Sequence, residues 1–110
     1  MCRIFAQLDP HIYASETRSV RLGGHATSIR LENAFWNVLE EIAAEQDVTL
    51  GRFLTTLYDE MLEMRGEVTN FASLLRCACL TYMGNVRGEP AARRALAETA
   101  ARDFAAVPAT

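Results

Sequence analysis

Residues 25–57 read HATSIRLENAFWNVLEEIAAEQDVTLGRFLTTL, and this stretch decides the fold. Its first seven residues alternate in polarity and place Ile29 and Leu31 on one face, which predicts a β-strand. The apolar residues that follow recur with helical spacing, which predicts an amphipathic helix over about residues 33–46. Thr49 then suits the N-cap of a second helix. The predicted order is therefore strand, helix, short connection and helix.

A second alternating segment precedes this strand. Val20 and Leu22 point one way, and a Gly-Gly pair follows them. Two glycines can supply the positive φ angles of a two-residue hairpin, in which Leu22 would face His25 and Val20 would face Thr27. Alternatively, residues 18–24 only lead into the strand, which then pairs with another chain. The sequence leaves both arrangements open.

The rest of the chain predicts further helices. Arg65-Gly66 ends the second helix, and Thr69 or Asn70 caps a third, FASLLRCACLTYM, which is apolar on nearly all sides. Pro90 suits the first turn of a last, alanine-rich helix. We therefore expect three segments, which are a mostly irregular arm over residues 1–17, a main domain over residues 18–83 and a helical tail over residues 84–110.

The composition limits the class of protein. The chain has 110 residues, of which 50% are hydrophobic, and this suits one domain with a modest core. It has no apolar run long enough to span a membrane, and its first ten residues, MCRIFAQLDP, lack the apolar stretch of a secretory signal. We therefore expect a cytoplasmic protein. An odd number of cysteines, Cys2, Cys77 and Cys79, favours reduced thiols over disulfides.

The charge is unevenly distributed. The formal net charge of -3 argues weakly against a nucleic-acid binder, because DNA-binding domains are usually basic. Residues 1–31, however, carry four arginines against two acids, whereas residues 32–47 carry five acids and no base. The N-terminal part is therefore the positive part.

A lone strand followed by two helices cannot pair all of its backbone groups or bury all of its apolar surface within one copy. Its backbone donors and acceptors lack partners, and one helix pair cannot bury both its own apolar face and that of the strand. Antiparallel pairing of the strands of two copies would solve both problems. The outward face of the paired strands would then form a ribbon of the width that enters a DNA major groove.

Residues 27–57, TSIRLENAFWNVLEEIAAEQDVTLGRFLTTL, resemble the ribbon-helix-helix DNA-binding domains. The longer run SVRLGGHATSIRLENAFWNVLEEIAAEQ, with NFASLLRCACL after it, resembles a bacterial subfamily with a G-H-x-T-S-I-x-L-E type strand entry. The resemblance implies a mainly α fold in which a short N-terminal strand, or a hairpin, precedes three to four helices in an intertwined homodimer. One departure is Asp47, which replaces the usual turn glycine and adopts a left-handed conformation only at some cost.

The resemblance also implies a function and its residues. It predicts a sequence-specific DNA-binding regulator of transcription that is no enzyme and needs no cofactor. The implied DNA contacts are Arg30, Ser28, Ala26, Arg21, Thr49 and Arg52. Arg30 is the natural bidentate donor to guanine, and the turn that begins at Thr49 would offer N–H groups and the Arg52 guanidinium to phosphate. Arg18 and Arg21 would add nonspecific attraction.

A second hypothesis is an antitoxin-like or other interaction module, in which the tail over residues 84–110 grips a partner protein. The acidic total and the extra C-terminal helix favour it. No arrangement of carboxylates, nucleophile and base, or phosphate loop points to catalysis.

Several side chains have structural interpretations. We interpret His25 as a histidine that hydrogen-bonds the turn, with a metal site shared with His11 or a cysteine as the alternative. Cys77 and Cys79 lie about 200° apart on a helix, so they cannot chelate one ion within one chain, and we expect both in the core. We expect packing roles for the remaining large side chains of interest, which are Phe35, Trp36, Met61 and Met64.

Overall fold

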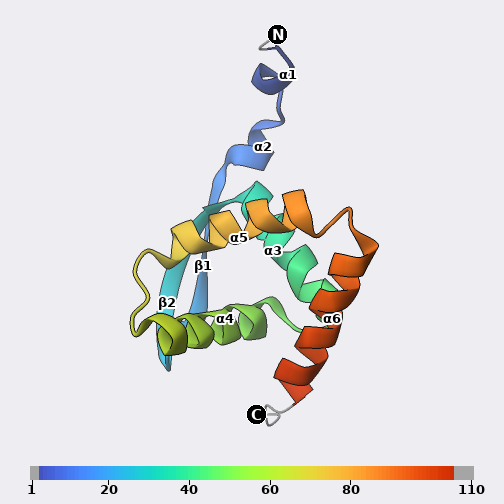
Figure 1. Ribbon diagram of the computed structural model, residues 1–110. Coiled ribbons are helices and arrows are strands. Elements are labelled where there is room, and N and C mark those ends of the chain that lie inside the picture. Colours follow the sequence, from blue (N-terminus) through green and yellow to red (C-terminus); the bar gives the residue numbers. More distant parts are fainter. Residues whose placement is uncertain (1–2, 106–110) are drawn as a thin grey trace.

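The structure is a computed structural model that describes residues 3–105 (Figure 1). The expected tail extends past this range to residue 110, and Cys2 also lies outside it. The elements in chain order are α1 (Arg3–Ala6), α2 (Pro10–Tyr13), β1 (Ser15–Leu22), β2 (His25–Glu32), α3 (Asn33–Glu45), α4 (Leu50–Arg65), α5 (Phe71–Asn85) and α6 (Pro90–Ala105).

The two strands form an antiparallel hairpin, so the hairpin interpretation is confirmed and the lead-in alternative is wrong. Leu22 pairs with His25 and Val20 with Thr27, which is the predicted register. The two turn glycines have φ angles of 59° and 83°, which glycine adopts without the steric cost that a side chain brings. Strand β1 begins at Ser15, and α1 and α2 precede it, so the segment over residues 1–17 is more regular than expected.

The helix boundaries follow the predicted signals closely. Helix α3 ends at Glu45, and Asp47 turns the chain with a φ angle of 55°, as expected of a residue in the place of a turn glycine. The Thr49 hydroxyl accepts a hydrogen bond of 3.2 Å from the Arg52 amide and caps α4. Asn70, rather than Thr69, caps α5 through its side chain.

The core lies between the hairpin and three helices. Helices α3, α4 and α5 all contact the hairpin. One face of the hairpin contributes Leu22, Ile29 and Leu31, each at most 5% exposed. The helices contribute the other buried side chains of this cluster, which are Trp36, Leu39, Ile42, Ala43, Phe53, Leu54, Leu75, Cys79 and Tyr82. The predicted inward face of β2 is therefore confirmed.

Two expectations about packing are wrong. Cys79 is buried, but Cys77 is exposed, because residues two apart on a helix point to different sides. Met64 is 77% exposed, since it lies in the last turn of α4, where the helix extends beyond the core. Trp36 is buried as expected, and its indole N–H donates to the Glu16 carbonyl at 2.8 Å.

The two ends of the described chain differ in how they relate to the hairpin core (Figure 1). Helices α1 and α2 project as an arm beyond one end of the hairpin. Helix α6 crosses back towards α3 and the start of α4, and Leu96 packs against the core. The alanine-rich segment is therefore a docked helix within the described part of the chain.

Candidate nucleic-acid interface

The hairpin presents one face to the helices and the other to solvent. Residues directly opposite each other in an antiparallel pair point to the same side. The solvent side therefore carries three pairs in a row, which are Thr17 with Arg30, Ser19 with Ser28, and Arg21 with Ala26. All six residues are exposed. This outer face is polar, and its only charges between residues 17 and 30 are the two arginines.

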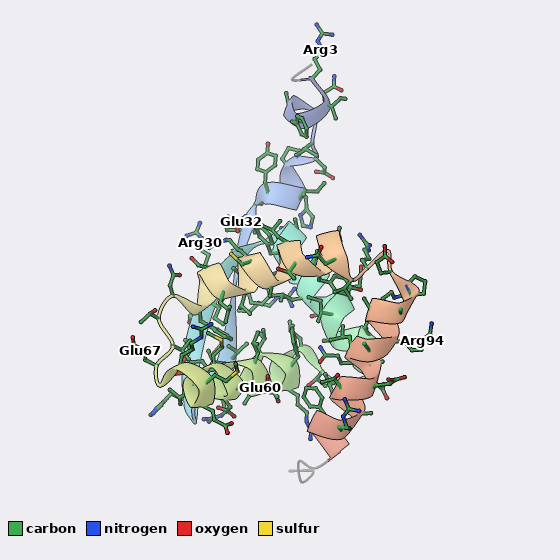
Figure 2. The ribbon with its side chains drawn as sticks, in the orientation of Figure 1. Arg3, Arg30, Glu32, Glu60, Glu67 and Arg94 are labelled. Carbon is green, nitrogen blue, oxygen red and sulfur yellow. The ribbon has the colours of Figure 1, made fainter. Side chains whose placement is uncertain are left out.

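Three of the predicted base contacts lie together on this face. Ala26, Ser28 and Arg30 are successive outward residues of β2. The Arg30 side chain points away from the helices (Figure 2). A guanidinium in this position has room to meet a planar pair of acceptors, as on the edge of a guanine.

The one acid on this side of β2, Glu32, sits at the end of the strand and is already paired. Its carboxylate accepts a hydrogen bond of 3.0 Å from Arg76 Nε in α5. A hydrogen bond from its own backbone and then the Arg76 side chain lower the pKa of Glu32. Its negative charge is therefore balanced by a cation from the body of the protein.

Arg21 is held at the turn end of the outer face. Its guanidinium donates to the Gly24 carbonyl at 3.0 Å, and its own carbonyl accepts from the Thr55 hydroxyl of α4 at 2.7 Å. Tyr58 of α4 lies against Gly23, where an added Cβ would be 3.4 Å from the ring. Helix α4 therefore fixes the position of the turn. The side chain that hydrogen-bonds the turn backbone is that of Arg21, while His25 is exposed.

Arg18 lies on the opposite face of the hairpin from the predicted base contacts. Its partner across the hairpin is the buried Ile29. Its guanidinium lies 4.7 Å from the Trp36 ring centre and forms ion pairs of 2.7 Å with Glu16 and 3.0 Å with Glu40. The Glu16 hydrogen bond is the main cause that raises the pKa of Arg18. The alternation that places Val20 and Leu22 inward also places Arg18 on the inward face, so the sequence could have predicted its position.

The remaining predicted residues lie at the start of α4. Thr49 serves as the helix cap. Arg52 faces α6, where its Nη2 atom donates to the Phe104 carbonyl at 3.3 Å and its guanidinium carbon lies 5.8 Å from the Phe104 ring centre. The structure therefore gathers Ala26, Ser28, Arg30 and Arg21 on one face and directs Arg52 towards the C-terminal helix. The sequence carried no signal for this contact, because it joins segments 52 residues apart.

Other kinds of site find no support in the described part of the chain. Residues 3–105 contain no group of three or more histidine, cysteine, aspartate or glutamate side chains able to hold a metal ion. Among the helices of that range, none has the length and apolar character needed to cross a bilayer.

Known proteins resemble the chain in sequence and in structure. A family model described as the ribbon-helix-helix domain matches residues 15–83. No curated protein matches significantly. A solved structure, that of an uncharacterized protein from Bordetella pertussis Tohama I, is 41% identical in sequence and superposes with a TM-score of 0.80, covering 99% of this chain and 90% of that one. The family match takes in both strands and the three helices around them, and the chain belongs to the ribbon-helix-helix domain family.

Proposed function

We propose that the protein is a sequence-specific DNA-binding regulator of transcription that acts as a homodimer in the cytoplasm. The observation that carries the proposal is the outer face of the hairpin, which is exposed, polar and free of acids between residues 17 and 30. Membership of the ribbon-helix-helix domain family supports it. The chemistry is recognition only, without a cofactor.

The hairpin changes how two copies can meet. In the described chain the sheet has two strands, so β1 pairs with one edge of β2 and no strand pairs with the other edge. We propose that the open edges of two β2 strands pair in antiparallel fashion, which gives the strand order β1-β2-β2-β1. Neighbouring strands lie about 4.8 Å apart, so the two β1 strands would be roughly 14 Å apart.

A four-stranded sheet of this width would place its residues against different parts of the DNA. A major groove is about 12 Å wide and accommodates two strands. The central β2 strands would therefore enter it and present Ala26, Ser28 and Arg30 to the bases. The outer β1 strands would lie over the groove walls, where Arg21 meets phosphate. Thr49 and Arg52 would contact phosphate farther out, at the start of α4.

The antitoxin-like alternative has weaker support. It requires the tail to grip a partner protein, and such a partner would have to compete with the contact that α6 makes on its own chain through Ala100, which is 2% exposed. It remains a prediction with a direct test. A partner-binding tail should give a stable heteromeric complex in a pull-down, and substitution of exposed α6 residues should abolish that complex.

The proposed function is tested by replacing single arginines with alanine and comparing how tightly the variants bind DNA. A selection from random duplexes with the purified protein first supplies a preferred site. Arg30→Ala should then weaken binding to that site by about 1 to 3 kcal/mol and reduce the preference over random DNA. Arg21→Ala should weaken binding to both DNAs alike and lower the salt slope by about one.

Arg94 supplies the matched control, because it is an exposed arginine on α6, far from the hairpin (Figure 2). Arg94→Ala removes the same charge and should leave site preference unchanged. Equal losses for Arg30→Ala and Arg94→Ala would refute the base-contact role. Failure of the native protein to bind any duplex at low salt would refute the proposed function itself.

A further inference from the structure

Helix α6 engages the one proposed DNA-contacting arginine that lies away from the hairpin. Arg52 donates to the Phe104 carbonyl at 3.3 Å and stacks at 5.8 Å from the centre of its ring. A guanidinium that is held by a carbonyl oxygen and covered by a ring has fewer donors and less open surface for another acceptor. Docked α6 therefore competes with any phosphate for Arg52.

The contact between α6 and the rest of the protein is thin. Ala100 is its one buried side chain within residues 90–102, and Leu96 and Phe104 are half-buried. Cavities of about 370 Å³ and about 220 Å³ flank Phe104. Both open to solvent, so the parts of Phe104 that line them face water and not packed side chains. The apolar contribution to docking is therefore small.

Ion pairs supply much of the remaining attachment. Arg93 pairs with Glu45 of α3, and Arg87, just before α6, pairs with Glu41 at 2.9 Å. The arginine side chains of both pairs are about half exposed, at 47% and 51%. The glutamate side chains are less exposed, at 22% and 32%, but solvent and salt still screen the exposed side of each pair, so each adds only a modest amount. Helix α6 is thus held by few buried side chains and by partly exposed ion pairs.

We propose that α6 is an autoinhibitory element that withholds Arg52 from DNA phosphate until it is displaced. The inference rests on the proposed function, since it concerns a phosphate contact of that same DNA-binding surface. A charged phosphate oxygen makes a stronger hydrogen bond with a guanidinium than a neutral carbonyl does. The cost of undocking α6 offsets this gain, so the native protein binds DNA with α6 docked and with Arg52 still held by Phe104.

The test uses the full chain with α6 released by substitution. Ala100→Glu places a carboxylate in the buried seat, whereas Ala95→Glu adds the same charge at an exposed position of α6 and serves as the control. Amide hydrogen exchange of residues 90–105 reports release, and Trp36 fluorescence reports the core. Ala100→Glu should bind the selected duplex about tenfold more tightly than Ala95→Glu, with a salt slope steeper by about 0.9 per chain.

Arg52→Ala identifies the group responsible. In the Ala100→Glu protein it should remove the gain in affinity, whereas in the native protein it should have little effect. Arg87→Ala with Arg93→Ala is a second way to release α6, and Arg94→Ala with Arg102→Ala removes the same number of charges from exposed positions. The first pair should bind DNA more tightly than the second.

The outcomes separate the two proposals. Release of α6 without any gain in affinity would overturn the autoinhibitory role alone, as would an equal effect of Arg52→Ala in both proteins. Full amide protection of α6 both in the Ala100→Glu protein and in the protein with Arg87→Ala and Arg93→Ala would also overturn it, because α6 would then be strongly docked. Absence of binding by every protein, including the native one, would overturn the proposed function and this inference with it.

Discussion

Single residues account for the turns of this chain. The Thr49 cap was predictable from its position before an apolar helical pattern, and so was the left-handed turn residue Asp47, from its place in the connection. Both are local features, decided by the backbone within a few residues. The Arg18 stack on Trp36 and the Arg52 contact with Phe104 were not predicted, because they depend on how distant elements pack.

Asp47→Gly should stabilise the protein. Asp47 is exposed and has a φ angle of 55°, a conformation that costs a side chain free energy but costs glycine little. We expect the free energy of unfolding to rise by about 0.5 to 1 kcal/mol, measured by urea denaturation. Ala44→Gly, at an exposed position in the last turn of α3, is the control and should lower stability by up to about 1 kcal/mol. A loss of stability in Asp47→Gly would show that its side chain matters more than its backbone conformation.

The two described cysteines should differ in reactivity. Burial raises the pKa of Cys79 from 9.0 to about 11, whereas Cys77 is exposed. In a Cys2→Ser chain at pH 8, an alkylating reagent should therefore modify one thiol quickly, and mass spectrometry should place it at Cys77. Because the pKa of Cys79 is higher in the folded state, this thiol favours folding below pH 9, and its contribution declines as pH rises towards 11. Rapid modification of Cys79 in the folded protein would contradict its buried position.

At the scale of elements, the order and type of the main helices and of β2 were predictable, because periodicity and caps act locally. The hairpin register was also predictable once two glycines were assigned to the turn. The start of β1 at Ser15 was not, since residues 15–17 carry no clear alternation, and their pairing partners at residues 30–32 decide their conformation.

Two glycines should respond to alanine with opposite signs. Gly24 has a φ angle of 83°, so Gly24→Ala introduces backbone strain although no atom lies within 4 Å of the new Cβ. We expect a loss of about 1 to 2 kcal/mol in unfolding free energy. Gly84 lies in α5 with equally open space around it. Gly84→Ala should instead add about 0.5 to 1 kcal/mol, and thermal denaturation should show both shifts. Equal shifts would argue against a strained turn.

At the scale of the whole molecule, the sequence predicted the fold family but left the self-paired hairpin as one of two arrangements. The dimer was inferred from a strand without a partner, and the structure gives β2 one partner from its own chain. The outward position of Ala26, Ser28 and Arg30 followed from strand parity, whereas their role as base contacts was implied by the family resemblance. The docking of α6 could not be predicted, because its alanine-rich sequence has only a thin apolar face.

The proposed homodimer should make stability depend on protein concentration. Mass action stabilises an associated native state, so the Tm should rise as the chain concentration increases. Sedimentation equilibrium should show two chains at micromolar concentration. Ser28→Pro should weaken association more than it weakens the fold. Proline has no backbone N–H, so residue 28 could no longer donate a hydrogen bond within β2, and a strand edge that pairs with another strand tolerates this poorly. A Tm that is constant over a hundredfold concentration range would contradict the dimer.

Self-pairing of the hairpin also has a kinetic consequence. In the proposed homodimer, each chain would form its hairpin before it meets the other, since the contacts of β1 with β2 join neighbouring segments and close quickly. The dimer would then form by association of folded monomers and not by folding of two intertwined chains. Two differently tagged preparations should accordingly trade subunits under native conditions, without passing through the denatured state.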